Sequence, residues 1–523
     1  MPQLSIKNRF LVTTCLIAMS LMHFATASAK ELRIAYDTGP VTLDIHQQLS
    51  GGVLQLSHMS FDPLIRWTKE LAFENRLAAS YARLNPTAVR FKLRKGVKFH
   101  SGNPMTAADF KWTFDRLKVS FDFKVIFANF TELNVIDDYT IDLVTSGPYP
   151  LVLHMATYIF PMDSKFYSGT DADGNDKGAI VKSGDSFAST NLSGTGPFKV
   201  VSHEPGVKIV FERFADYWDK SSAGNVDRIV FTPIEDEQTR VAALLSGDVD
   251  FIAPVSSDFL DQISSDSNVV LVTMPGTQII TFQMNQQRRP EFRDQRVRMA
   301  IVHAVNSEAI VQKVMKDFAT PASQYSPAGY LGYNPRLKPR FDLKLAKRLM
   351  QDAGYENCFS VTMMAPKDRY VNDERIARTV AAMLSKINIK VELQIVPKAQ
   401  YWPAFDDRDA DIMMLGWHSV TEDSANFYEF LAMTPDQSTG MGTYNSGNYS
   451  SDFVDRSTVM ANAETDPVKR AKILQEIESR IYQDAGFIPL HWQSLAWAAR
   501  KGVNIDPIVN ALNSPYLGDL IVD

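Results

Sequence analysis

Hydrophobic and polar positions alternate most clearly in residues 90–117, RFKLRKGVKFHSGNPMTAADFKWTFDRL. Phe91 and Leu93 alternate with charged residues, which is typical of a strand with one buried face. Gly96 interrupts this pattern before two further apolar positions at 97–99, so we expect a turn and a second strand there. The first half of the stretch therefore predicts two short strands joined by a turn.

The second half of the same stretch has the pattern of a capped helix. Thr106 is followed three residues later by Asp109, a spacing typical of an N-terminal helix cap. Phe110, Phe114 and Leu117 then recur at helical spacing, which gives the predicted helix one apolar face.

Two other parts of the chain alternate strands and helices with short connections. The first has strands at 31–36, 199–202, 207–211 and 249–252, and a helix at 236–245 that ends at Gly247. The second has helices at 342–354, 376–387 and 466–486, and strands at 360–364, 389–395 and 411–415. Strand, helix and strand in succession are typical of parallel α/β sheets, so we expect two α/β lobes.

Length and composition bound the class of protein. With 523 residues the chain is too long for one ordinary core, which predicts two or three domains. Apolar residues make up 45% and charged residues 22%, as in soluble globular proteins. The net charge of −6 argues against a nucleic acid or an anionic membrane surface as the partner.

The N-terminus has the order of a secretory signal peptide. Lys7 and Arg9 precede an apolar run at 10–21, and the small residues at 27–29 form a cleavage site before Lys30. The run is shorter than the roughly 20 residues that span a membrane as a helix. We therefore expect cleavage after Ala29 and a periplasmic protein, with a retained anchor as the alternative.

Seven further motifs accompany the stretch at 90–117 in a fixed order. They are FDPLIRW (61–67), LAASY (77–81), GTGPF (194–198), ADYW (215–218), LLSGDVDF (244–251), RVRMAIVHAVN (296–306) and IPLHW (488–492). Together they resemble the extracytoplasmic solute-binding proteins of family 5, the peptide, nickel and glutathione binders of bacterial ABC importers. The resemblance covers essentially the whole chain after the signal.

This resemblance implies an α/β fold, namely the two-lobed periplasmic binding protein fold of class II, cluster C, with an accessory domain and a ligand cleft between the lobes. The implied segments are the signal peptide at 1–29, lobe I at 30–61, 187–282 and 487–523, the accessory domain at 62–186, and lobe II at 283–486. The chain would cross between the lobes near 282–285 and 486–492, which predicts a hinge. The family's accessory domain usually lies away from the ligand, so residues 90–117 are expected to be structural.

The loop after the predicted strand at 411–415 is the first candidate for a binding site, because ligands bind at the carboxyl ends of strands in open α/β sheets. Trp417 offers stacking area there. Peptide binders of the family usually carry, three residues after this Trp, an Asp that pairs with the peptide's α-amine, whereas this chain has Val420. Glu422 and Asp423 follow, and either could replace the missing acid or be a solvated loop residue.

A second candidate is Arg369, in a loop that follows a predicted strand and precedes a helix. The resemblance implies that an arginine in this loop pairs with the ligand's carboxylate. A guanidinium suits this role, because it can donate two parallel hydrogen bonds to one carboxylate. Further candidate lining residues are Tyr370, His418, Tyr36 and Thr38.

No pattern typical of catalysis or metal binding occurs in the sequence. There is no G-x-S-x-G or H-E-x-x-H motif, and no two histidines after residue 29 stand three or four residues apart. Cys358 is the only cysteine after the signal, so an intramolecular disulfide is impossible. We expect no catalytic residue, no metal, no cofactor and no enzyme activity, with a secreted hydrolase as the alternative.

The sequence therefore predicts a periplasmic substrate-binding component of an ABC importer. It is expected to be a monomer that binds a di- or oligopeptide between two lobes and delivers it to the membrane permease. The departure at Val420 leaves open a non-peptide anionic solute, a glutathione-like conjugate or a nickel chelate as the ligand. A sensory or chaperone-like binding protein without a transporter is a further alternative.

Overall fold

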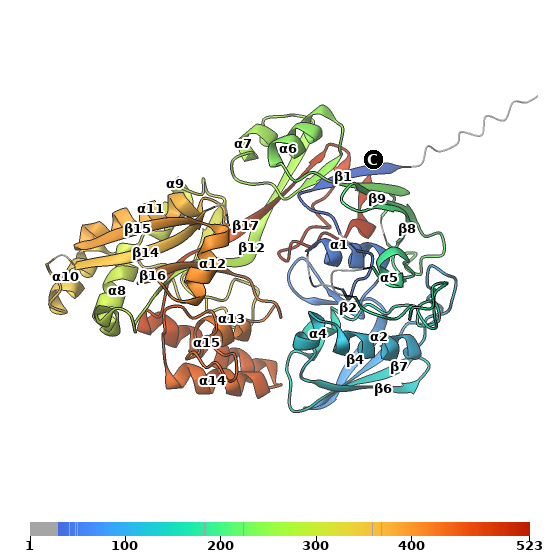
Figure 1. The fold of residues 1–523 in the computed structure, drawn as a ribbon, viewed down its shortest axis with the longest axis horizontal. Coiled ribbons are helices and arrows are strands. Elements are labelled where there is room, and N and C mark those ends of the chain that lie inside the picture. The colour runs from blue at the N-terminus through green and yellow to red at the C-terminus, as the bar shows by residue number, and fades with distance from the viewer. Residues whose placement is uncertain are drawn as a thin grey trace, which may run out of the picture.

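The structure is a computed structural model that describes residues 30–523, except for residues 41, 48, 50, 182–184, 223, 358 and 368. The predicted signal peptide and Cys358 therefore lie outside the described residues. Two lobes lie side by side, connected by the long strands β12 (Val269–Met284) and β17 (Ile488–Arg500) (Figure 1). These two strands pair with each other in antiparallel orientation, so the chain passes twice between the lobes along one two-stranded ribbon.

The ribbon joins both lobes into one 11-stranded mixed sheet, in the order β15-β14-β16-β12-β17-β11-β1-β10-β9-β8, with β13 paired to β17. The lobe I strands are β1 (Glu31–Tyr36), β8 (Phe198–Glu204), β9 (Lys208–Arg213), β10 (Arg228–Pro233) and β11 (Phe251–Ala253). The lobe II strands are β13 (Ala319–Pro321), β14 (Phe359–Lys367), β15 (Ile389–Pro397) and β16 (Ile412–Trp417). β1 is parallel to β10 and β11, and β14 is parallel to β15 and β16, which confirms an α/β arrangement in each lobe.

Helices accompany this sheet in both lobes, some packed on the sheet and some, such as α10 and α14, packed on other helices. Those of lobe I are α1 (Gly51–Ser60), α5 (Phe187–Thr190), α6 (Glu237–Ser246), α7 (Leu260–Ser264) and η3 (Leu517–Asp519). Those of lobe II are η1 (Pro290–Arg293), α8 (Gln295–Ala304), α9 (Ser307–Lys313), α10 (Leu343–Asp352), α11 (Asp373–Leu384), η2 (Ser385–Ile387), α12 (Lys398–Asp406), α13 (Ser424–Leu431), α14 (Asp452–Ala463) and α15 (Pro467–Asp484). Two short strand pairs, β2 (Ile65–Trp67) with β3 (Phe73–Asn75) and β18 (Val503–Asn504) with β19 (Ile521–Val522), complete lobe I.

Several of these helices begin and end where the sequence predicts them. Asp236 caps α6 and accepts a hydrogen bond from a backbone N–H of its first turn, and Gly247 ends the helix with φ +87°. Asp342 and Asp466 cap α10 and α15 in the same way. The predicted strands at 31–36, 360–364 and 389–395 are confirmed as β1, β14 and β15.

Residues 78–145, all of which the structure describes, contain a separate sheet in the order β4-β5-β7-β6. Its strands are β4 (Ala78–Asn85), β5 (Ala88–Leu93), β6 (Phe130–Asp137) and β7 (Thr140–Thr145), accompanied by α2 (Ala107–Val119) and α3 (Phe123–Ile126), with α4 (Val152–Ala156) following. A capping box between Thr106 and Asp109 starts α2, as predicted, and Phe110, Phe114 and Leu117 of its apolar face are buried.

The prediction of a second strand at 97–99 is wrong. Only one isolated bridge forms there, between Lys98 and Pro104. The Phe99 N–H donates to the Asn103 carbonyl at 2.9 Å, so the chain folds back on itself within a few residues and leaves no room for a ladder. The apolar alternation reflected burial of Val97 and Phe99 in the core of this sheet, not pairing.

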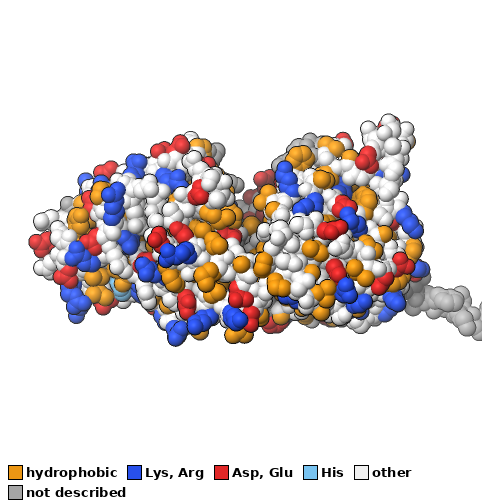
Figure 2. Space-filling view, turned by 90° about the horizontal axis from the view of Figure 1, so that it is seen from below, with side chains coloured by type: hydrophobic (Ala, Val, Ile, Leu, Met, Phe, Trp, Pro, Cys, Tyr) orange, Lys and Arg blue, Asp and Glu red, His pale blue; other side chains and the backbone are white. Residues whose placement is uncertain are grey.

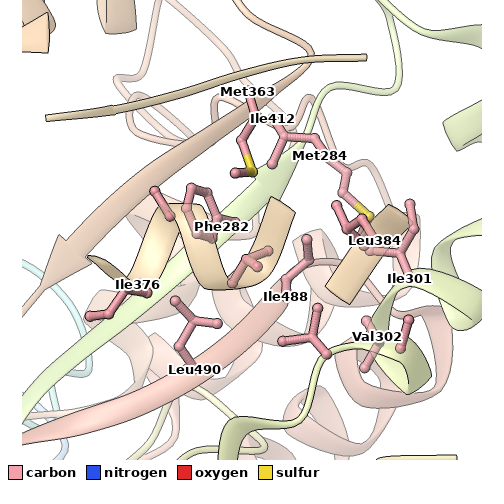
Figure 3. Close-up of a cluster of buried hydrophobic side chains, with 14 of the residues drawn as sticks. Phe282, Met284, Ile301, Val302, Met363, Ile376, Leu384, Ile412, Ile488 and Leu490 are labelled. Atoms are coloured by element: carbon pink, nitrogen blue, oxygen red, sulfur yellow. The ribbon is translucent and has the colours of Figure 1, made fainter. Parts of the chain in front are cut away.

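The C-terminal end of β12 and the N-terminal end of β17 belong to the core of lobe II, whereas the other ends of both strands pack in lobe I. Phe282 and Met284 of β12 and Ile488 of β17 lie in one buried cluster with residues of α8, α11, β14 and β16 (Figure 3). A change of the angle between the lobes therefore cannot occur within this segment of the ribbon without disturbing close packing. In the part of the chain that the structure describes, no helix is both long enough and apolar enough to span a membrane.

Candidate ligand-binding site

A cleft of about 570 Å³ lies between the lobes, and the molecular surface is hollowed between them in the view from below (Figure 2). Small-molecule sites have volumes of roughly 300–1,000 Å³, so the cleft has the size of such a site. Three parts of the chain form its walls. Lobe I contributes Leu49, Leu54, Tyr158, Leu512 and Ser514, and the connecting strands contribute Thr277, Gln278, Gln493 and Leu495. Lobe II contributes His418, Val420 and Glu422.

The cleft has one carboxylate and no lysine or arginine among the described residues that line it. That carboxylate belongs to Glu422, and His418 is the other side chain of the lining that titrates in the acidic to neutral range. On the face seen in Figure 2, by contrast, acidic and basic side chains are interspersed over both lobes. The lining therefore differs from the outer surface in having a single negative group.

The loop after β16 presents Val420 and Glu422 to the cleft. β16 ends at Trp417, and the Ser419 hydroxyl then accepts a hydrogen bond from the Asp423 N–H at 2.9 Å. Asp423 in turn caps α13, because its carboxylate accepts from a backbone N–H of the first turn. This tight loop lies at the carboxyl end of a buried strand, where ligands bind in open α/β sheets.

Asp423 forms a buried ion pair with Arg470. The Arg470 guanidinium donates to both of its carboxylate oxygens, at 2.6 and 2.7 Å. The two side chains are only 2% and 3% exposed. Burial works to raise the pKa of Asp423, but the charge and hydrogen bonds of Arg470 outweigh it and hold the pKa below its ordinary value. Of the two acids in this loop, Asp423 is therefore not free to bind a ligand.

Glu422 lies in the cleft wall, and its carboxylate, unlike that of Asp423, has no described arginine or lysine as a partner. Its backbone has φ +52°, a left-handed conformation that is uncommon for a residue with a side chain and that clusters at functional sites. Its carboxylate accepts a hydrogen bond from the Tyr330 hydroxyl. Burial raises the pKa of Glu422 to about 7, although the hydrogen bond from Tyr330 acts in the opposite direction.

Trp417 packs behind the loop. Its ring lies 4.7 Å from the Tyr444 ring and 5.4 Å from the Phe430 ring, measured between centroids. The indole N–H donates to the Asn426 side-chain oxygen at 3.1 Å. Trp417 is half-buried and is not among the described residues that line the cleft. Its role in ligand binding therefore stays a prediction.

Arg369 lies beside Tyr370 and close enough to His418, a residue of the cleft lining, for its charge to act there. Arg369 is exposed, with its guanidinium carbon 4.9 Å from the centre of the Tyr370 ring. Tyr370 is buried against the backbone of Gly416 and donates a hydrogen bond to its carbonyl at 3.4 Å. The pKa of His418 is lowered below its ordinary value, mainly by loss of hydration and to a smaller extent by the charge of Arg369. Arg369 thus lies within electrostatic reach of the lining, although it is not part of it.

Tyr36 and Thr38 lie elsewhere. The Tyr36 ring at the end of β1 packs against Phe231 and Phe251, with centroids 5.1 and 6.0 Å away, and burial raises its pKa. Thr38 is exposed, and its hydroxyl donates to the neighbouring Asp37 side chain at 3.5 Å. Neither is among the described residues that line the cleft, so the structure does not bring them together with His418.

Sequence reasoning missed most of the lining. Tyr158 follows α4 and belongs to the block that was expected to lie away from the ligand, yet it lines the cleft. Its hydroxyl donates a hydrogen bond to the Val420 carbonyl of the other lobe at 3.4 Å. From the same block, Leu71 packs against the buried cluster of lobe II that contains Tyr330. Thr277 and Gln493 enter from the connecting strands. No local pattern marks any of these residues, because their neighbours in space are distant in sequence.

Two lobes joined by a two-stranded ribbon, with a cleft between them, define the class of two-lobed periplasmic binding proteins. A model of the family "Bacterial extracellular solute-binding proteins, family 5 Middle" matches residues 72–438. The chain belongs to this family of substrate-binding proteins of ABC transporters. The family consists of solute-binding proteins and not of enzymes.

Individual relatives agree with this assignment. The glutathione-binding protein GsiB of Escherichia coli (strain K12) is 23% identical over 498 residues, which cover 93% of this chain and 94% of GsiB. HbpA2 from Haemophilus parasuis has a TM-score of 0.83 at 21% identity, covering 94% of this chain and all of that one. The periplasmic binding protein DppA from Helicobacter pylori, in complex with the peptide STSA, has a TM-score of 0.71 at 22% identity, covering 94% and 98%. The predicted two-lobed fold is confirmed.

Proposed function

We propose that this protein is the periplasmic substrate-binding component of an ABC importer and that its ligand is a short peptide with a free amine. The observation that carries the proposal is the cleft between the lobes, whose one described charged side chain is the carboxylate of Glu422. Family membership supports the transport role. The names of two relatives, a glutathione-binding protein and a peptide complex, support a ligand of peptide type.

The charges around the cleft favour a peptide over an anionic solute. Above about pH 7, where Glu422 is largely ionised, an anion would meet a like charge in the lining, and like charges brought together in an interface cost several kcal/mol. Arg369 supplies one positive group beside the cleft, and no described carboxylate pairs with its guanidinium. We assign the ligand's amine to Glu422 and its carboxylate to Arg369. A glutathione-like peptide, which has an amine as well as carboxylates, fits the same pattern.

Calorimetry with a panel of ligands tests this function. The panel contains dialanine, trialanine and glutathione, the N-acetylated form of trialanine, a dicarboxylate such as succinate, and a nickel–histidine chelate. We expect saturable binding of the free-amine peptides with no product formed. Tight binding of succinate or of the chelate alone, or turnover of any peptide, would overturn the proposal. Native mass spectrometry of protein purified from its own periplasm then identifies a co-purified ligand by mass.

Ligand binding is expected to draw the lobes together. The two-stranded ribbon of β12 and β17 connects the lobes, which face each other across the cleft. This arrangement is suited to hinge closure around a ligand. Periplasmic binding proteins are the general example of such closure. Small-angle scattering should show a smaller radius of gyration in the presence of a saturating peptide. An unchanged radius at saturation would contradict closure.

Export is expected to remove the first 29 residues. The order of positive, apolar and small residues before Lys30 is that of a secretory signal, and this segment lies outside the described residues. Intact-mass measurement of the periplasmic protein should give a chain that begins at Lys30. A periplasmic form that retains residues 1–29 would show instead that the segment is an uncleaved anchor.

A further inference from the structure

Glu422 faces two spaces at once. One is the cleft, and the other is a side cavity of about 50 Å³ that lobe I and Glu422 line together. The two spaces share the lining residues Leu54, Tyr158, Glu422, Leu512 and Ser514. His58 and Arg66 also line this cavity. A cavity needs roughly 10–15 Å³ to hold one water molecule, so this one has space for a group as small as an ammonium. A group bound at Glu422 therefore lies at the junction of the two spaces.

The other charged groups around this junction are already compensated. The Arg66 guanidinium lies 2.8 Å from Glu74 and 2.7 Å from Asp519, so two carboxylates surround one positive charge. The Asp423 carboxylate, next to Glu422 in sequence, is neutralised by Arg470. With Glu422 ionised, the junction consequently carries a net negative charge.

The remaining titratable groups at the junction are neutral near neutral pH. Burial, and then the charge of Arg66, lowers the pKa of His58 to about 3. The pKa of His418 is also lowered. Burial raises the pKa of Tyr158 and of Tyr330 above the ordinary value. No described lysine, arginine or histidine therefore supplies a positive charge to Glu422. Among the described residues, its carboxylate accepts a hydrogen bond from the Tyr330 hydroxyl alone.

We propose that Glu422 exchanges its proton for the primary ammonium of the ligand, so that capture of a peptide releases a proton to the solvent. This rests on the proposed function. The O–H bond of the Glu422 carboxyl breaks, the proton leaves through the cleft, and the carboxylate forms an ion pair with the R–NH₃⁺ group. No other bond changes, and charge is conserved.

The physical basis is that the two states of Glu422 respond oppositely to a bound cation. The cleft wall disfavours the charged form, which is why the pKa of Glu422 lies near 7 without a ligand. An ammonium at ion-pair distance favours the charged form and lowers that pKa. Below about pH 7, binding must therefore displace a proton, and the affinity is expected to fall about tenfold for each further unit of pH.

Calorimetry in two buffers measures this exchange directly. Trialanine and glutathione serve as probes at about pH 6, where a peptide amine of pKa about 7.7–8.0 is fully protonated. Titrations in phosphate and in imidazole, which differ in ionisation enthalpy, give the number of protons released. We expect nearly one proton per bound peptide for the natural protein and none for Glu422→Gln. At about pH 8, Glu422→Gln is expected to bind trialanine at least tenfold more weakly, since the ion pair is lost.

Two controls separate the exchange from a structural effect. Tyr330→Phe removes the hydrogen bond that favours the ionised form, so the pH range of proton release should move upward while binding is retained. N-acetyl-trialanine, which has no ammonium, should release no proton. Circular dichroism and thermal melting establish that both variants are folded.

The outcomes distinguish this inference from the function on which it rests. Binding of trialanine or glutathione with equal enthalpy in both buffers overturns the proton exchange and leaves the peptide-binding function in place. Undiminished affinity and proton release in Glu422→Gln overturn it as well. If no peptide binds, the proposed function is overturned and the proton exchange with it.

Discussion

Replacing Asp423 by alanine is expected to lower the free energy of unfolding by about 3–5 kcal/mol, because it leaves a buried arginine without its counter-charge. The Arg470 guanidinium donates two hydrogen bonds to this carboxylate, and both side chains are almost fully shielded from water. The change also removes the cap of α13. Urea unfolding at about pH 7, followed by circular dichroism, measures the loss.

A matched control is the exposed pair of Glu374 and Arg378 on α11, whose side chains are 36% and 63% exposed. Glu374→Ala should cost at most about 0.5 kcal/mol, because such pairs on a helix surface are screened by water. Equal losses in Asp423→Ala and Glu374→Ala would contradict the assignment of a buried pair.

The same pair has a defined pH dependence. The pKa of Asp423 is lowered in the folded state, so the stabilisation is present above the ordinary pKa of an aspartate, about 3.9. It is lost as the pH falls from that value through the lowered one.

Replacing Arg369 by alanine is expected to weaken peptide binding by about 2–5 kcal/mol, which is about 30-fold to several thousandfold in Kd. If Arg369 pairs with the ligand's carboxylate in a closed cleft, the truncation leaves that carboxylate without its bidentate partner. Arg369→Lys should recover only part of the affinity, because an ammonium has no planar fork. Calorimetry with trialanine on the three proteins measures the effect.

Arg378→Ala provides the control for this change, since it removes one exposed positive charge from the neighbouring helix α11 without approaching the cleft. Its affinity for trialanine should match that of the natural protein. An unchanged affinity in Arg369→Ala would show that Arg369 stays exposed when the ligand is bound and does not contact it. The carboxylate anchor would then have to be sought elsewhere.

The sequence by itself determined the elements whose signals are local. An aspartate cap and a glycine stop lie within one turn of the helix they bound, which is why α6, α10 and α15 could be predicted from Asp236, Asp342, Asp466 and Gly247. The parallel α/β character of both lobes followed from the order of strands and helices. The order of short motifs sufficed to indicate the family, which the match over residues 72–438 confirms.

Only the tertiary structure decided how the lobes are joined. β12 extends over 16 residues and contains Pro275 and Gly276, both of which are unfavourable inside a strand. Its register shifts at this point, and the strand continues because β17, more than 200 residues later, pairs on both sides of the shift. A pairing partner so distant in sequence leaves no local signal in β12 itself.

The tertiary structure also decided which candidate residues reach the cleft. Glu422 and Asp423 are adjacent acids and cannot be told apart by composition, yet Arg470, 47 residues away, neutralises Asp423 and leaves Glu422 facing the ligand space. Tyr36, another predicted lining residue, packs its ring against Phe231 and Phe251 and is not among the described residues that line the cleft. Helix caps and periodicity act between residues a few positions apart. Burial and electrostatic environment are set by residues brought together by folding, and these determine the site.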